Sequence, residues 1–237
     1  HKLPTELRFQ LMSFARFKFN THEEGDQRVL EHLPDTYRQR ISYILFEGVV
    51  NSVHIFESCA DLFLRQLHSS FTQTLYMPDQ QLATIDGLSN SLQILAEGEV
   101  DLTHRNGSVI DRRSEGEAFN AVSFLCKVGQ PYSVRTRMVC RVLALSASAW
   151  EAACTAFPEN LHRVRHNLLK MCENKIASCM PGTVGHITFT AAAALVRAHL
   201  VQQEELSIAM MCSAAARGDL PDLKRHLLAG SPNCSNY

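Results

Sequence analysis

The spacing of apolar residues changes twice along this chain, and this change constrains the fold more than any other feature. Before about residue 70 and after about residue 146, apolar residues recur every three to four positions, the period of an amphipathic helix. Between these regions lie short segments with the composition of β-strands, separated by turn residues such as Asp86-Gly87, Glu97-Gly98 and Asn106-Gly107. The predicted strands are Phe71–Tyr76, Gln81–Ile85, Leu92–Ala96, Glu99–Thr103, Val109–Arg112, Tyr132–Thr136 and Val139–Leu145. We therefore expect an α+β fold in which helices precede and close a small antiparallel roll.

Helices are predicted on both sides of these strands. One begins after Pro34, because proline is favoured in the first turn of a helix. Its apolar stripe is formed by Ile41, Ile44, Leu45, Val49 and Val50. Further helices are expected over Cys59–Ser69, from Ala147 onward, over Leu161–Met171 and over Thr188–Glu205. The residues around Pro181, Gly182 and Gly185 are expected to form a linker.

Composition and charge exclude several functions. Hydrophobic residues make up 46% of the 237 residues and charged residues 20%, so the chain can bury a proper core. There are 23 Lys and Arg against 24 Asp and Glu, and a net charge of -1 gives no general attraction for nucleic acid or anionic lipid. The nearly uncharged stretch Val142–Ala149 is far shorter than the ~20 apolar residues that span a bilayer. We therefore expect no transmembrane segment and no nucleic-acid partner.

The start of the chain and its cysteines indicate the cellular compartment of the protein and whether the chain is part of a longer one. No signal peptide is predicted, and because the chain begins with His1 rather than Met we expect a piece of a longer protein. The eight cysteines contain no Cys-x-x-Cys pair, which is typical of a protein from a reducing cytosol, and each is expected to be a small buried residue. They are Cys59, Cys126, Cys140, Cys154, Cys172, Cys179, Cys212 and Cys234.

Several segments resemble one family. The stretch from Leu33–Arg38 through Phe56 resembles the gating linker that follows the last pore helix in plant Shaker-type voltage-gated potassium channels. Residues 92–100 are similar to a strand pair of that family, and Gln130–Arg135 is similar to its "QPYTVR" segment. Residues 212–233 resemble the opening of an ankyrin repeat. The combination resembles the cytosolic C-terminal region of these channels. The sequences of Gln130–Tyr132 and Ala214–Leu228 are most similar to the outward-rectifying branch of the family.

The resemblance implies an organisation and a function. It implies a helical C-linker over residues 1–58, a cyclic-nucleotide-binding homology domain over 59–172, a linker and helix over 173–205, and a truncated first ankyrin repeat over 206–237. The chain would be the regulatory, gating and assembly region of a tetrameric channel at the cytosolic face of a membrane, most simply the plasma membrane. Its partners would be the pore and voltage sensor of the same polypeptide, neighbouring subunits, and proteins bound by ankyrin repeats. The candidate gating contacts are Leu33, Pro34, Ile44 and Phe46.

The resemblance also locates a ligand cassette, which departs from the family pattern. Members that bind cAMP or cGMP have Phe-Gly-Glu and then an Arg nine residues after the Glu. The glycine lets backbone N–H groups reach the cyclic phosphate, the glutamate binds the ribose, and the arginine neutralises the phosphate. Aligning Phe119 with that Phe, and Ser133 with the end of the cassette, places Asn120, Ala121 and Gln130 at these three positions. We therefore predict that the fold is kept without cyclic nucleotide or any other cofactor.

Other arrangements of the pocket stay open at this point. Starting the cassette at Gly116-Glu117 would put Cys126 at the arginine position, and a thiol cannot neutralise an anion. Arg135 lies an odd number of residues from Gln130, so it is expected on the opposite face of an extended strand. A remodelled pocket for another small molecule is the remaining possibility. The alternative function is a cyclic-nucleotide sensor, and a third is an ankyrin scaffold with further repeats.

Remaining polar groups give no sign of an active site. His162 and His166 have the i, i+4 spacing of two metal ligands, but no third ligand is evident and Arg163 and Arg165 add positive charge. We expect no metal, and no nucleophile motif suggests an enzyme. The acidic residues Glu23, Glu24 and Asp26 could pair with Arg38 and Arg40 of a neighbouring subunit, or form ordinary surface charge.

Overall fold

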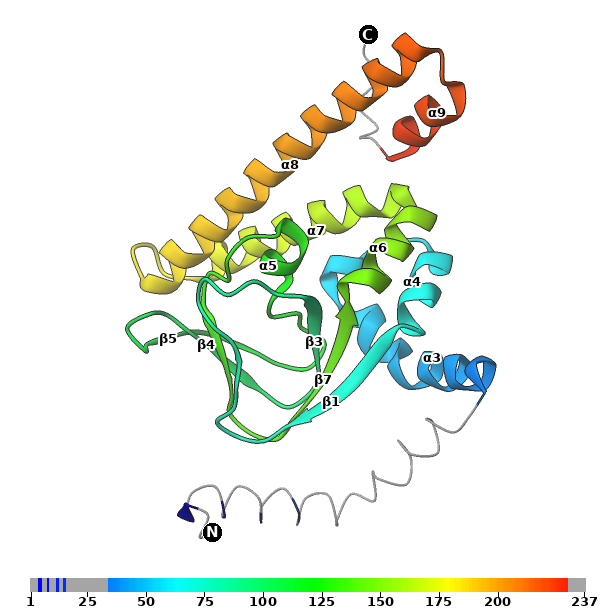
Figure 1. Ribbon diagram of the computed structural model, residues 1–237. Helices are drawn as coiled ribbons and strands as arrows, with labels where there is room; N and C mark the ends of the chain where they lie inside the picture. Colours follow the sequence, from blue (N-terminus) through cyan, green and yellow to red (C-terminus); the bar gives the residue numbers. More distant parts are fainter. Residues whose placement is uncertain (1–3, 6–7, 9–11, 13–14, 16–33, 230–237) are drawn as a thin grey trace.

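The computed structural model describes residues 34–229 and, before them, Pro4, Thr5, Arg8, Met12 and Ala15. Figure 1 shows a roll of strands with helices before it at one end and two long helices across one side. The predictions that concern Leu33, Glu23, Glu24 and Asp26 lie outside the described residues.

Three helical elements precede the roll. The first begins directly after Pro34, as predicted, and an extended Val53 ends it. The elements are α3 (Asp35–Ser52), the 3-10 turn η1 (His54–Phe56) and α4 (Asp61–His68). The predicted apolar stripe is partly wrong: Phe46 and Val50, one turn apart, are buried, whereas Ile44 and Leu45 are 72% and 56% exposed. The reason is that α3 packs on α4 through the other face, where the Tyr43 and His68 rings meet at 5.0 Å.

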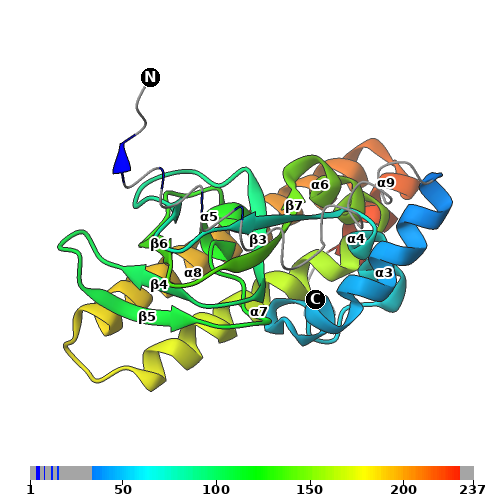
Figure 2. The ribbon, with the colours of Figure 1, turned by 90° about the horizontal axis from the view of Figure 1, so that it is seen from below.

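Seven strands among the described residues form the roll as two antiparallel sheets (Figure 2). One sheet has the order β1-β7-β3 and the other β2-β6-β4-β5. Gly98, at φ +103°, makes the tight turn between β3 and β4, where a Cβ would lie 2.6 Å from the Val139 carbonyl oxygen. The strands are β1 (Phe71–Tyr76), β2 (Gln81–Ala83), β3 (Ser91–Glu97), β4 (Val100–Thr103), β5 (Val109–Arg113), β6 (Ser133–Thr136) and β7 (Cys140–Ser146). The α+β prediction is confirmed.

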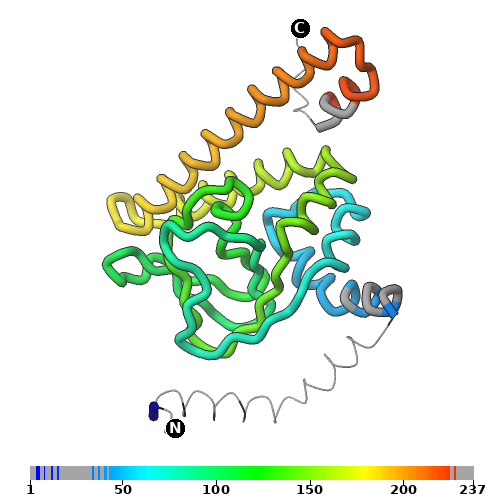
Figure 3. The backbone as a smooth tube through the Cα atoms, viewed as in Figure 1, coloured from blue at the N-terminus to red at the C-terminus, as the bar shows by residue number. Residues whose placement is uncertain are grey.

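Helices close the roll. The Ser146 hydroxyl caps α6 by accepting from Ala149 N, Pro158 occupies the first turn of α7, and Thr183 caps α8 by accepting from His186 N. The elements are α5 (Ala121–Cys126, within the roll), α6 (Ala147–Ala156), α7 (Pro158–Ser178), α8 (Val184–Arg217) and α9 (Leu220–Ala229). The expected boundaries at 172/173 and 205/206 fall inside α7 and α8. The smooth tube in Figure 3 follows α8 as one straight segment that leaves the roll and reaches α9.

Helix α8 differs from what we predicted. It has 34 residues instead of the 18 predicted over Thr188–Glu205, and by length and composition alone it could cross a membrane. Our expectation of no such segment rests on Val142–Ala149 and does not take α8 into account, which is a candidate by length and composition only. In the structure, one face of α8 is buried against the rest of the chain through Phe189, Ala193 and Val196.

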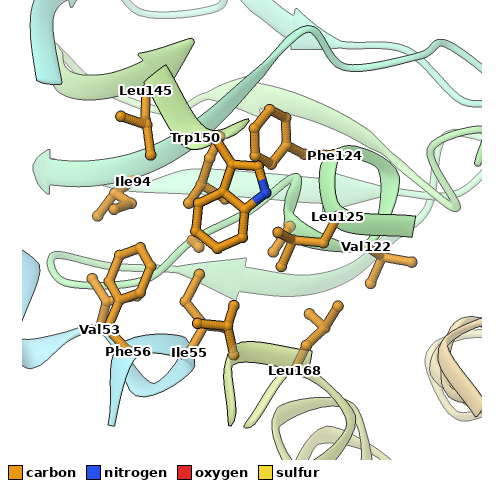
Figure 4. Close-up of a cluster of buried hydrophobic side chains, with 14 of the residues drawn as sticks. Val53, Ile55, Phe56, Ile94, Val122, Phe124, Leu125, Leu145, Trp150 and Leu168 are labelled. Atoms are coloured by element: carbon orange, nitrogen blue, oxygen red, sulfur yellow. The ribbon is translucent and has the colours of Figure 1, made fainter. Parts of the chain in front are cut away.

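Two clusters of buried side chains hold the fold together. The larger cluster joins α3, η1 and α4 to α5, α6 and α7, and Figure 4 shows its centre, where Trp150 lies among apolar side chains of both the helices and the roll. The Trp150 ring makes edge contacts with Phe63 at 5.9 Å and Phe124 at 6.2 Å. The smaller cluster fills the interior of the roll. The helices before and after the roll therefore share one core.

Candidate functional site

The predicted cassette is a buried excursion between β5 and β6. Ala118 bridges to Ile94 of β3, Phe119 is fully buried in the roll interior, and the six residues of α5 are all buried. The helix begins where Phe124 N donates to Asn120 O, and it ends at Lys127, whose φ is +56°. The position of Phe119 is therefore set by the same strands that close the roll.

Both the oxygen and the nitrogen of the Asn120 side-chain amide are hydrogen-bonded within the protein. Its Oδ1 accepts from Gln93 N at 2.8 Å, and its Nδ2 donates to Ser91 O at 2.8 Å and to Ser89 Oγ at 3.2 Å. The residue is only 2% exposed. A side chain with these partners ties the cassette to β3, and it fills space that a glycine would leave free for a ligand.

Gln130 is likewise a structural cross-link. Its Nε2 donates to Phe119 O at 3.0 Å, and its backbone exchanges hydrogen bonds with Asp86 and Gly87. The side chain is 1% exposed, and Oε1 has no hydrogen-bond partner among the described residues. A neutral amide in this position holds the cassette closed but supplies no positive charge for an anion.

The other predicted cassette residues offer no replacement charge. Ala121 is buried and has no polar side chain. Ser133 Oγ accepts from Ile85 N at 3.1 Å. Arg135 lies on the outer face of β6, opposite the buried Val134, and its Nη1 pairs with Asp79 Oδ1 at 2.8 Å. The structure thus brings Phe119, Asn120, Ala121 and Gln130 together, and it places Arg135 outside the roll, as its spacing predicted.

A hollow of about 260 Å³ lies beside Asn120. It is lined by residues 81–84 of β2 and the segment after it, by residues 87–91, and by Gln93 and Asn120. None of these lining residues carries a charge. A phosphate placed here would meet only neutral groups.

An ion cluster around the buried Arg113, which the sequence did not reveal, lies at the end of β5. Arg113 is 2% exposed, and its Nη1 lies 2.9 Å from Glu117 Oε1 and 3.5 Å from Asp111 Oδ2. Lys175 of α7 joins them, with Nζ 2.9 Å from Asp111 Oδ2 and 3.5 Å from Glu117 Oε1. We call these four residues the Arg113 ion cluster. Its two positive and two negative charges balance, which a buried guanidinium requires.

The electrostatics of Glu117 follow from this cluster. Burial alone would raise the pKa of its carboxyl, but the Ser114 backbone N–H, Arg113 and Lys175 outweigh burial and lower that pKa. The carboxylate also accepts from Ser114 Oγ at 3.2 Å. The sequence signal for this cluster is weak, because Asp111-Arg112-Arg113 reads as exposed strand charge and Lys175 lies 58 positions after Glu117.

Nucleophiles and metal ligands show no catalytic arrangement in the described part of the chain. Burial raises the pKa of the Cys59, Cys126 and Cys172 thiols to about 11 and that of Cys154 to about 12, which keeps them protonated. The cysteine prediction is confirmed for Cys59, Cys126, Cys140 and Cys172. Cys154 and Cys179 are only half-buried, and the prediction is wrong for Cys212, which is exposed because it lies on the outer face of α8. The His162 and His166 rings lie 4.3 Å apart, yet the described residues hold no group of three or more metal-ligating side chains.

Of the predicted gating residues, three are described. Pro34 is exposed immediately before α3, Ile44 is exposed on its outer face, and Phe46 packs into the larger core cluster. The structure therefore gives Phe46 a contact within the chain, whereas Ile44 faces outward.

The fold can be assigned to a class of protein by comparison with known families. Residues 74–157 match the family described as the cyclic nucleotide-binding domain. The chain carries such a domain, in which the strands and α5 are arranged as described above.

Similarity extends well beyond this domain. The chain is 29% identical over 225 residues to "Potassium channel AKT1" of Oryza sativa subsp. indica, which covers 92% of this chain and 23% of that protein. It is 25% identical over 243 residues to "Potassium channel SKOR" of Arabidopsis thaliana (100% and 28%), and 27% identical over 191 residues to "Potassium channel KAT1" of the same plant (78% and 28%).

These comparisons make the chain homologous, over most of its length, to plant Shaker-type potassium channels. The chain spans about a quarter of the length of these relatives. The relatives named here are similar to it at 25–29% identity, so the comparisons do not single out the outward-rectifying branch. All three are named as channels rather than as enzymes.

Proposed function

We propose that this chain is a regulatory region of a potassium channel, at the cytosolic face of a membrane, and that its roll does not respond to cAMP or cGMP. The observation that carries the second part is Gln130. The position expected to neutralise a cyclic phosphate holds a neutral amide whose Nε2 is already bonded to Phe119 O. Asn120 and Ala121 support the proposal, because neither can play the part of the glycine or the glutamate.

The size of the expected loss follows from the chemistry. A hydrogen bond to a charged group contributes about 1.5–3 kcal/mol, which corresponds to roughly a 10- to 150-fold change in affinity. A phosphate left without a counter-charge in a closed site costs more than one such bond. Without the arginine and the glutamate, nucleotide affinity should therefore fall by several orders of magnitude.

The proposed mechanism is mechanical. In a tetramer, linker helices of neighbouring subunits would form a ring below the pore, and displacement of the ring would change the relative energy of open and closed pore states. Phe46 would couple α3 to the core shared with the roll, whereas exposed Ile44 and Pro34 would face other parts of the channel. Leu33 would also make gating contacts in this ring.

The proposed organisation follows the expected domains. Residues 1–58 would be the linker and 59–172 the cyclic-nucleotide-binding homology domain, with 173–205 connecting it to the start of an ankyrin array over 206–237. In support, the end of α8 and α9 form a helix hairpin across Gly218, whose φ is +67°, and Arg217 pairs with Asp222 at 3.1 Å. Further repeats would provide a surface for protein partners.

Calorimetric titration of cAMP and cGMP tests the nucleotide proposal. The chain is compared with the triple variant Asn120→Gly, Ala121→Glu, Gln130→Arg. We expect no binding heat from the unaltered chain and binding by the variant. The matched control is Thr74→Arg, which adds a positive charge at an exposed position of β1 outside both the cassette and the hollow beside Asn120, and it should not bind.

Two further measurements keep this test decisive. Because Asn120 and Gln130 have structural hydrogen bonds, circular dichroism and thermal unfolding must first show that the triple variant is folded. If it is not, the unaltered chain still tests the proposal with a fluorescent cAMP analogue at rising concentration. Micromolar binding of either nucleotide by the unaltered chain would overturn the proposal and favour a nucleotide sensor.

A further inference from the structure

One aromatic ring in the roll interior does not come from the roll. The smaller core cluster contains apolar residues of β3, β4, β6 and β7 together with Phe119 and Tyr132, and it also contains Phe189. Phe189 belongs to α8 and is 2% exposed. Figures 1 and 2 both show the start of α8 against the roll, from which the rest of the helix extends toward α9.

The Phe189 ring has two specific neighbours. The Tyr132 ring meets it edge to face, with 6.1 Å between centroids and 63° between planes. The Arg113 guanidinium carbon lies 5.9 Å from the Phe189 centroid. Both geometries are favourable for an aromatic ring, the first between rings and the second between a cation and a π face.

The Arg113 ion cluster holds the guanidinium in place beside this ring. Glu117 fixes it from the turn that leads to the cassette, Asp111 from β5, and Lys175 completes the charge balance from α7. Tyr132 also lies near Arg113, which opposes the rise in the pKa of Tyr132 that burial causes. The groups around the ring are therefore fixed by elements other than α8.

A glycine allows Phe189 to reach this position. At Gly185 a Cβ would lie 3.1 Å from the Ile110 carbonyl oxygen, so the first turn of α8 runs against the backbone of β5. Phe189 follows one turn later on the same helix face, because residues four apart on a helix are neighbours. The close approach at Gly185 therefore directs the Phe189 ring into the roll.

We infer that the roll interior, walled by Tyr132 and the Arg113 guanidinium, is a binding site for an aromatic ring, and that Phe189 of α8 is its built-in ligand. The site holds the first turns of α8 on the roll. This inference does not rest on the proposed channel function, because every group in it belongs to the described chain.

The test is chemical rescue of Phe189→Ala in the full chain. Removing the ring leaves a cavity walled by apolar side chains of the roll, the Tyr132 ring and the Arg113 guanidinium, and largely apolar cavities of this kind can bind small aromatic molecules. We expect amide hydrogen exchange in residues 184–192 to rise by roughly tenfold or more, with little change in β1, β3 and β7. Millimolar indole should restore the protection, whereas cyclohexanol, which has no π face, should not.

Two control variants make the comparison sharp. Ile187→Ala removes a side chain that is 61% exposed, two positions earlier on the same helix, and should change nothing. Phe189→Leu keeps apolar volume without a ring and should give an intermediate loss of protection. It also replaces the alanine variant if that variant does not fold.

Three results would overturn the inference. Unchanged exchange in 184–192 would show that the ring does not hold α8. An equal rise of exchange in both sheets would make Phe189 an ordinary core residue of the roll. A local rise that indole does not reverse would show that the interior has no site for a free aromatic ring.

Discussion

Arg113 Nη1 and Glu117 Oε1 lie 2.9 Å apart where β5 turns toward the cassette, and the next residue back, Arg112, faces the opposite way. Arg113 is 2% exposed in its side chain and Arg112 is 61% exposed. Two adjacent arginines therefore carry the same charge in opposite environments, which makes them a natural pair for mutagenesis.

We expect Arg113→Ala to lower the free energy of unfolding by up to about 3 kcal/mol, because Asp111 and Glu117, which are partly exposed and keep Lys175, would lose the more buried of their two counter-charges. Arg112→Ala should cost about 1 kcal/mol or less, since its pair with Asp101 lies at the surface. Urea unfolding followed by circular dichroism measures both. Equal losses for the two variants would show that the ion cluster does not contribute as the geometry indicates.

Replacing Asn120 by alanine should destabilise the chain by about 1–3 kcal/mol, because Gln93 N and Ser91 O would lose their side-chain partner in a buried place. Asn90→Ala is the control, since Asn90 is exposed and, among the described residues, its one hydrogen bond is from Ala147 N to its backbone oxygen. Thermal unfolding compares the two. A control that loses as much as Asn120→Ala would contradict the structural role of the cassette amide.

Stability should fall as pH is lowered from about 7.5 to 5.5. Burial lowers the pKa of His68, His162 and His199 below the usual 6.5, so in this range the unfolded chain binds more protons than the folded one. The stabilisation is complete above the ordinary histidine pKa and is lost as pH falls toward the lowered folded values. The thermal midpoint of unfolding, measured at several pH values, follows this loss.

His68 supplies a direct check of the cause. It is 1% exposed and lies edge to face with Tyr43, and the nearby Glu47 only partly offsets the effect of burial on its pKa. We expect His68→Phe to lose less stability on acidification than the unaltered chain. Exposed His54→Phe serves as the control. The explanation fails if His68→Phe and the unaltered chain have the same pH dependence.

Cysteine reactivity should separate one thiol from the others. In a Cys234→Ser background, which removes the cysteine outside the described residues, exposed Cys212 should react first with a maleimide at pH 7.5. Cys59, Cys126 and Cys172 are buried and Cys154 is half-buried, and all four should react much more slowly than Cys212, because burial raises the pKa of their thiols. Peptide mapping by mass spectrometry identifies the labelled sites. Early labelling of any of these four would contradict the packing.

The strands could be predicted closely because their turn residues punctuate the chain. Six of the predicted strands end within one residue of the observed ones, while the second was expected to Ile85 and ends at Ala83. The short α5 was not predicted as a helix, since six consecutive buried residues show no helical period. The stripe on α3 was misplaced because Ile44 and Phe46 are both apolar, and only the position of α4 decides which one is covered.

The cassette residues were placed by resemblance, but their hydrogen bonds were not predictable. Nothing in the sequence shows that the Gln130 amide reaches Phe119 O, since the partner is a backbone atom 11 residues away. The contact between Phe189 and Tyr132 joins residues 57 positions apart, on a helix whose start was expected four residues later. Long-range contacts of this kind depend on how the helices pack, which local patterns do not encode.

Helix α8 contains neither glycine nor proline between His186 and Arg217, so no residue provides a natural hinge. At a rise of ~1.5 Å per residue, Phe189 and Arg217 are about 42 Å apart along a stiff rod. A sideways movement of about 4 Å at the α9 end corresponds to a rotation of roughly 5° over that length, and it would act on the α7 surface on which α8 packs as far as Leu200 as well as on the roll. Forces applied to the hairpin by whatever binds there would thus reach Tyr132 and Arg113 as torque rather than be absorbed by a flexible connection.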